Sequence, residues 1–150
     1  MILITCVNGL KEEPDQQANK ENTMSHFTTV KTKFTDQNTL VESLKELGYN
    51  QVKVGTFQCR GYEGNQTTVE ILIELQGGYD IGFVNKTDSY EMVADWWGIK
   101  SISQTELTSK LNQRYSILAT TQELKNKGFS LNEETLSNGT VRLVARKLGG

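Results

Sequence analysis

The sequence is poor in the residues from which catalytic centres are usually built. Its 150 residues include one histidine (His26), one proline (Pro14) and two cysteines (Cys6 and Cys59). Neither cysteine has a neighbour at CxxC spacing, so they match no zinc or redox motif, and we expect two reduced thiols. We interpret the lone histidine as a hydrogen-bonded surface residue, because no triad can be built around it. The sequence therefore assigns no catalytic residue, no metal ligand and no cofactor.

Charge of one sign and long apolar runs are also lacking. The formal net charge is -2, and acidic and basic residues alternate along the chain without forming blocks. Proteins that bind nucleic acid usually show a basic patch, so we expect no nucleic-acid partner. The apolar start, residues 1–7, has no basic flank and is much shorter than a membrane span. We therefore expect neither a signal peptide nor insertion into a membrane.

The first part of the chain differs from the rest. Residues 8–23 contain Pro14 and no apolar periodicity, which predicts a loop or linker. We expect residues 1–23 to be an extension that is flexible or that arises from an upstream start, with Met24 as the candidate natural initiator. The remainder, residues 24–148, is long enough for a single domain with one core.

From residue 27 onward the pattern predicts strand, helix, four strands, helix and two strands. Alternation of apolar and polar residues is clearest at 67–76, where Val69, Ile71 and Ile73 share one face. Helices are expected after Thr35 or Asp36 and after Ser103, and they should end near Gly48 and Gly128. The other strands are expected at 27–34, 52–57, 79–83, 90–97, 129–136 and 141–145.

Helices and antiparallel hairpins that do not alternate regularly indicate an α+β fold. We expect a mostly antiparallel sheet with both helices on one face. A ferredoxin-like core with extra strands is the nearest simple topology.

The paired tryptophans, Trp96 and Trp97, end the strand predicted at 90–97. Successive strand residues point to opposite faces, so only one indole can enter a single-sided core. We assign Trp96 to the core, on the face of Met92 and Ala94, where it should meet the apolar stripe of the second helix. Trp97 is then the accessible ring.

A binding surface is the most specific functional prediction. Arginine and aromatic side chains dominate protein interfaces, and the loop that follows Arg60 offers both beside exposed glycines. The predicted binding residues are Arg60, Tyr62, Tyr79, Asp80, Asp95 and Trp97. The leading hypothesis is a non-enzymatic accessory domain that binds another protein.

The alternative is a small-molecule-binding domain or an enzyme. Asp95, Asp80 and Arg60 would then converge on a pocket beside a tryptophan. A concave pocket that holds at least two of these three side chains would favour this alternative over a protein-binding surface.

Five motifs together resemble one family. They are Met24-Ser25-His26-Phe27-Thr28, Arg60-Gly61-Tyr62-x-Gly64, Tyr79-Asp80-Ile81-Gly82-Phe83, Val93-Ala94-Asp95-Trp96-Trp97-Gly98 and Gln113-Arg114-Tyr115. Over about residues 24–146 the chain resembles the hypothetical chloroplast reading frame 35 family, also catalogued as domain of unknown function 1257. The resemblance implies a soluble protein of the plastid stroma or the cyanobacterial cytoplasm, without established catalytic residues. The first 23 residues depart from the family pattern.

Overall fold

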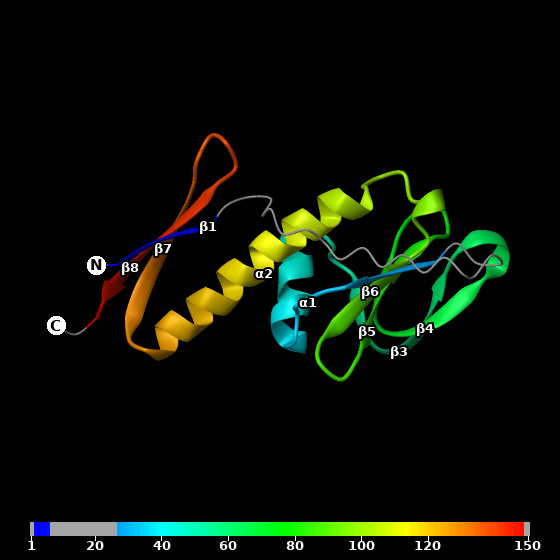
Figure 1. Ribbon diagram of the computed structural model, residues 1–150, viewed down its shortest axis with the longest axis horizontal. Helices are drawn as coiled ribbons and strands as arrows, with labels where there is room; N and C mark the ends of the chain where they lie inside the picture. Colours follow the sequence, from blue (N-terminus) through cyan, green and yellow to red (C-terminus); the bar gives the residue numbers. More distant parts are fainter. Residues whose placement is uncertain (1, 7–26, 149–150) are drawn as a thin grey trace.

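The computed structural model describes residues 2–6 and 27–148 (Figure 1). These residues form a five-stranded sheet of order β2-β6-β5-β4-β3, a three-stranded sheet of order β1-β8-β7, and two α-helices. The strands are β1 (Ile2–Cys6), β2 (Thr28–Lys31), β3 (Val52–Arg60), β4 (Gln66–Glu74), β5 (Asp80–Asn85), β6 (Tyr90–Ala94), β7 (Phe129–Thr135) and β8 (Val141–Lys147). The helices are α1 (Gln37–Glu46) and α2 (Gln104–Asn126). The predicted α+β class, with mostly antiparallel strands, is confirmed.

The strand order differs from a ferredoxin-like core. In the five-stranded sheet, β3 to β6 form a meander and β2 lies beside β6, so α1 joins strands at opposite edges. The strand that follows α2 does not return to this sheet but joins the other one. The length of α2 explains the difference, because 23 helical residues extend roughly 35 Å and carry the chain past the first sheet (Figure 1).

β1 was not predicted. It pairs antiparallel with β8, from Ile2 opposite Ala145 to Cys6 opposite Val141. A short apolar run gives no local sign of a partner at the far end of the chain, so the sequence alone could not reveal this pairing. The rest of the predicted extension, residues 1 and 7–23, lies outside the described residues, as do Met24 and His26, and the extension stays a prediction.

Both helices pack on one face of the five-stranded sheet, as predicted. The main core joins Leu40 and Leu44 of α1 and Leu107 and Leu111 of α2 to buried residues of the sheet, such as Phe83. Farther along α2, a second small core forms around Ile117, Val141 and Leu143. One helix therefore contributes to the cores of both sheets.

The predicted helix starts are confirmed at the level of single hydrogen bonds. Asp36 caps α1, where its Oδ2 accepts a hydrogen bond from the backbone N–H of Thr39 at 2.7 Å. Ser103 caps α2, where its Oγ accepts from the backbone N–H of Glu106 at 3.1 Å. Each cap satisfies a backbone donor that has no partner within the helix.

Three consecutive residues of α2 connect the three-stranded sheet to the segment before α1. Arg114 forms an ion pair with Glu133 of β7 at 2.8 Å, and Gln113 donates a hydrogen bond to the carbonyl oxygen of Gly139 in the β7–β8 turn at 3.0 Å. The hydroxyl oxygen of Tyr115 accepts two hydrogen bonds from backbone N–H groups just before α1, at 3.1 and 3.0 Å. The Gln113-Arg114-Tyr115 motif thus joins the α2 helix to both halves of the molecule.

Candidate binding surface

The β3–β4 hairpin bends back across the sheet, and this bend creates the candidate site. Along β4, Gln66 pairs with Arg60 and Glu74 pairs with Asp80, at opposite ends of the strand. A straight strand of that length would separate Arg60 from Asp80 by roughly 25 Å. Instead, the backbone nitrogen of Arg60 lies 2.9 Å from Oδ2 of Asp80. The tip of the hairpin therefore lies over β5.

Two local features of the strands accompany the bend. A register shift between Val54 and Phe57 marks a bulge in β3, and bulges increase strand twist and curvature. On β5, Gly82 has no side chain, and a Cβ there would lie 2.5 Å from Cγ1 of Val69. The glycine thus allows β4 to cross close to β5, and Val69 joins a small buried cluster with Cys59 on this side of the sheet.

Arg60 and Asp80 meet at the base of the folded-back hairpin. The Asp80 carboxylate is 0% exposed, and it accepts hydrogen bonds from Nε and Nη2 of Arg60, both at 2.8 Å. The hydrogen bond to Asp80 also raises the pKa of Arg60 above its usual value. Two parallel hydrogen bonds of this kind fix both direction and distance. The pair therefore anchors the hairpin tip to the start of β5.

Asp95 fixes the two loops that carry Tyr62 and Trp97. It is fully buried, and its Oδ2 accepts a hydrogen bond from the backbone N–H of Tyr62 at 2.8 Å. Its Oδ1 accepts from the backbone N–H of Trp97 at 3.2 Å. A Cβ at Gly61 would lie 3.1 Å from Oδ2 of Asp95, so the glycine permits this close approach.

The prediction that the strand runs through Trp97 is wrong. β6 ends at Ala94, and Trp96–Gly98 form a short 3-10 helix, η2. The hydrogen bond from the Trp97 N–H to Asp95 caps this turn and removes the N–H from any strand pairing. The assignment of the two rings nevertheless agrees with the structure. Trp97 is 58% exposed, whereas Trp96 is half-buried against the main core.

Three aromatic rings gather above these carboxylates. The ring centroids of Tyr62 and Trp97 lie 4.9 Å apart with an edge-on angle of 83°, and those of Tyr79 and Trp97 lie 6.4 Å apart. Tyr62 belongs to a second 3-10 helix, η1 (Tyr62–Gly64). We call Tyr62, Tyr79 and Trp97 the aromatic cluster. Because its loops are held by buried carboxylates, the cluster is set in place before any ligand arrives.

The pKa values of Tyr62, Tyr79 and Cys59 are raised, which favours the neutral form of each of these side chains. Burial and the nearby Asp95 raise the pKa of Tyr79, and the hydrogen bond to Glu63 raises the pKa of Tyr62. Below the cluster, burial raises the pKa of Cys59 to about 12. A thiol that stays protonated is a poor nucleophile, so Cys59 is unsuited to covalent catalysis.

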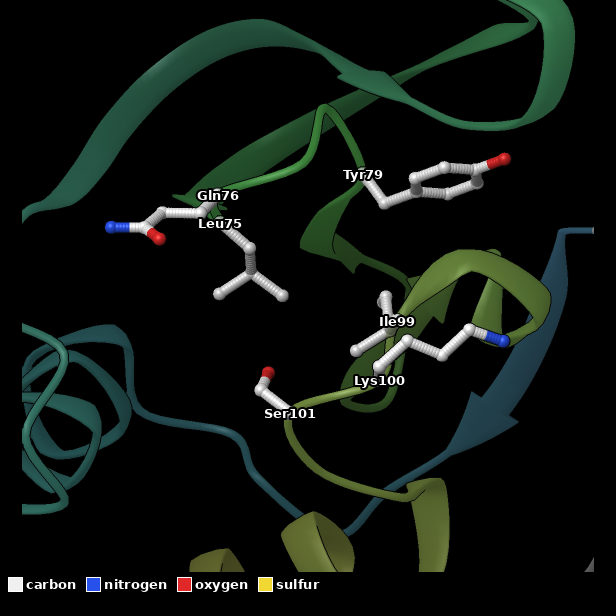
Figure 2. Close-up of a pocket in the computed structure, with 6 residues that line it drawn as sticks. All are labelled: Leu75, Gln76, Tyr79, Ile99, Lys100 and Ser101. Carbon is white, nitrogen blue, oxygen red and sulfur yellow. The ribbon is translucent and has the colours of Figure 1, made fainter.

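Figure 2 shows a pocket that Tyr79 of the aromatic cluster helps to line. Its volume is about 510 Å³, and its lining residues are Leu75, Gln76, Tyr79, Ile99, Lys100 and Ser101. Tyr79 is the one predicted site residue among them. Asp95, Asp80 and Arg60 do not line this pocket, so it does not meet the criterion set for the small-molecule alternative. Within residues 2–6 and 27–148, no group of three or more His, Cys, Asp or Glu side chains is arranged to hold a metal ion.

The structure thus brings all six predicted site residues together, but in two roles. Asp80 and Asp95 lie underneath as buried supports, whereas Arg60 and the aromatic cluster reach the surface. Sequence reasoning missed Lys100, whose Nζ lies 5.7 Å from the Trp97 ring centroid and 3.0 Å from the Trp97 carbonyl oxygen. A lysine shortly after an exposed tryptophan was the available signal, because cations often pair with aromatic faces.

Comparisons with known proteins agree with the resemblance seen in the motifs. A family model described as "Protein of unknown function (DUF1257)" matches residues 43–144. A protein of Cyanophora paradoxa named "Uncharacterized protein ycf35" is 33% identical over 127 residues, which cover 83% of this chain and 98% of that protein. Proteins of the same name from Pyropia yezoensis and Guillardia theta are each 30% identical, with the same coverage of both chains. No solved structure matches.

These relatives are plastid-encoded, which is consistent with a plastid location. Within the described part of the chain, neither α-helix is long and apolar enough to cross a membrane.

Proposed function

This chain belongs to the DUF1257 family, and we propose that it is a non-enzymatic accessory domain that binds another protein through the aromatic cluster and Arg60. The observation that carries the proposal is that Trp97 is 58% exposed on a loop whose backbone donates a hydrogen bond to the buried carboxylate of Asp95. Large aromatic residues on rigid supports lose little entropy on binding, and they supply most hot-spot energy in interfaces. We place the protein in the plastid stroma or in the cyanobacterial cytoplasm.

The two buried carboxylates support binding over catalysis. Asp80 accepts its hydrogen bonds from Arg60, and Asp95 accepts from two backbone N–H groups. Both carboxylates therefore support the loops of the proposed binding surface. The Arg60 side chain is 44% exposed. Its guanidinium has five N–H donors, and because only some of them bond to Asp80, the others can donate hydrogen bonds to a partner.

Trp97→Ala tests the proposal. The full chain and its variant serve as baits in plastid or cyanobacterial extracts, and quantitative mass spectrometry identifies proteins that the wild type retains. We expect the variant to bind a retained partner at least about 30-fold more weakly, which corresponds to a hot-spot loss of about 2 kcal/mol. Purified partner and titration calorimetry then give the affinity ratio directly.

Leu148→Ala is the matched control. Leu148 has the same exposed fraction as Trp97, 58%, but follows β8 at the other sheet. Its truncation should leave partner affinity unchanged. Equal retention of every partner by the wild type and Trp97→Ala would contradict the proposed surface.

A further inference from the structure

We infer that the pocket in Figure 2 takes an apolar side chain of the partner, and that Lys100 binds the carboxylate of an acidic residue beside it in the same segment. This inference rests on the proposed function, because it names the chemistry of the segment that docks there. The occupant is thus a peptide segment in which an aspartate or glutamate lies next to an apolar residue.

The inner wall of the pocket is apolar. Leu75 is half-buried and Ile99 is 7% exposed, and both side chains extend toward the hollow (Figure 2). Tyr79, a member of the aromatic cluster, also lines the pocket. At about 510 Å³, the space exceeds what one water molecule or ion fills and falls within the range of pockets that enclose organic groups. Burial of an apolar side chain in this pocket would be favourable in free energy, because its surface leaves water.

The rim is polar and carries one sign of charge. Lys100 is the one charged residue that lines the pocket, and Gln76 and Ser101 are its other polar residues. Lys100 forms no ion pair with a residue in the described part of the chain, and its Nζ donates to the Trp97 carbonyl oxygen. An ammonium group has three donors, so two remain for a carboxylate. Charge complementarity therefore selects an acidic segment over a neutral or basic one.

The pocket and the aromatic cluster share one residue, and a second residue of the pocket contacts the cluster. Tyr79 lines the pocket and also packs near Trp97, and the ammonium of Lys100 lies over the Trp97 ring. Because extended peptides advance about 3.3 Å per residue, a segment of a few residues can contact both places. A single docking segment can thus gain most of its binding energy from contact with Trp97, while the pocket and Lys100 select its sequence.

Panning a phage library of random dodecapeptides on the full chain tests the charge preference. We expect wild-type selections to enrich Asp or Glu within two positions of an apolar residue. Lys100→Glu should reverse this preference toward Lys or Arg, because the rim charge is inverted. Lys127→Glu is the matched control, since it reverses an exposed lysine at the far end of α2 and should leave the wild-type preference unchanged.

A modified peptide and a protein variant test the acidic residue and the pocket separately. The most enriched peptide, labelled with fluorescein, should bind about tenfold more weakly when its acidic residue is replaced by the corresponding amide. Ser101→Trp should fill the mouth of the pocket from an exposed position and abolish binding. Circular dichroism and the thermal midpoint establish that each variant remains folded.

The outcomes separate this inference from the proposed function. Selections with no acidic preference, a preference that survives Lys100→Glu, or a failure to enrich any peptide would overturn the inference. If this happens while Trp97→Ala still weakens a native partner, the proposed function stands. If the Lys100-dependent preference appears but Trp97→Ala leaves native partners unaffected, the proposed function fails and the peptide site stands.

Discussion

The guanidinium of Arg60, at the end of β3, holds the fully buried carboxylate of Asp80, at the start of β5, through two hydrogen bonds of 2.8 Å. These strands are not neighbours in the sheet, since β4 lies between them. The contact exists because the β3–β4 hairpin bends back, and it fixes the loop that carries Tyr62. The same pair therefore contributes to stability and positions the candidate surface.

Removal of the Arg60 side chain should leave the Asp80 carboxylate buried with one backbone donor. We expect Arg60→Ala to reduce the free energy of unfolding by about 3 kcal/mol, the lower end of the cost of breaking a buried pair, because the Arg60 side chain is 44% exposed. Arg60→Lys should recover only part of this loss, since an ammonium cannot form both parallel hydrogen bonds.

Urea unfolding measures these changes, with Arg142→Ala as the control. Arg142 also pairs with a glutamate, Glu134, at 2.9 Å, but both side chains are well exposed. Such surface pairs contribute about 0–1 kcal/mol. If Arg60→Ala and Arg142→Ala had the same small effect, the Arg60–Asp80 pair would not stabilise the folded hairpin.

The two tryptophans should differ in their contribution to stability. Trp96→Ala opens a cavity beside the main core, and we expect a loss of about 3 kcal/mol because the ring is half-buried. Trp97→Ala should cost about 1 kcal/mol or less, since most of the ring is in water. Urea unfolding of the two variants gives the order, and a larger loss for Trp97→Ala would reverse our assignment of the buried ring.

Trp96→Phe refines this comparison. The Trp96 Nε1–H is buried and has no hydrogen-bond partner in the described part of the chain. Phenylalanine keeps an aromatic ring in the core and removes this unpaired donor, so the variant should lose clearly less stability than Trp96→Ala.

Gly98 allows the Tyr79 ring to lie against the backbone of η2. A Cβ at residue 98 would lie 2.1 Å from Cζ of Tyr79, so Gly98→Ala must displace the ring. We expect a loss of about 1–3 kcal/mol from this overpacking. In a Tyr79→Ala background the same change should cost much less, and a double-mutant cycle of unfolding free energies measures the difference. Purely additive losses would show that the ring and the glycine do not interact.

Cys59 should make stability fall at alkaline pH. Burial raises the pKa of its thiol from 9.0 to about 12, so the folded state holds the proton more tightly than the unfolded state. This contribution is complete below pH 9 and is lost as the pH rises toward 12. Unfolding free energies between pH 8 and pH 11 should therefore fall less in Cys59→Ala than in the wild type. Parallel pH profiles for the two proteins would contradict the shifted pKa.

Iodoacetamide provides a second measurement on the same thiol. At pH 8 we expect alkylation of Cys59 only after unfolding, because the reagent needs the thiolate and the side chain is buried. Mass spectrometry of the tryptic peptides distinguishes this residue from Cys6. Rapid labelling of Cys59 in the folded protein would overturn the prediction.

The local rules of the sequence determined most elements of this fold. The caps at Asp36 and Ser103 follow from side chains that bond nearby backbone groups, and the β7–β8 hairpin follows from Asn138-Gly139. Alternation in β4 predicted the burial of Val69, Ile71 and Ile73, although Leu72 on the other face is buried as well. The apolar stripe of α2 predicted the burial of Leu107 and Leu111. In each case the deciding residues lie within a few positions of one another, so the chain itself carries the signal.

Tertiary structure alone decided how these elements meet. The bend of β3 and β4, the close crossing of Val69 over Gly82, and the pairing of β1 with β8 join residues that are distant in the sequence. The end of β6 before Trp96 likewise depends on Asp95, whose carboxylate is held by the N–H of Tyr62 from another loop. The sequence therefore predicted six candidate site residues, but only the fold separated the buried carboxylates from the rings that reach the surface, because burial depends on which distant segments cover a side chain.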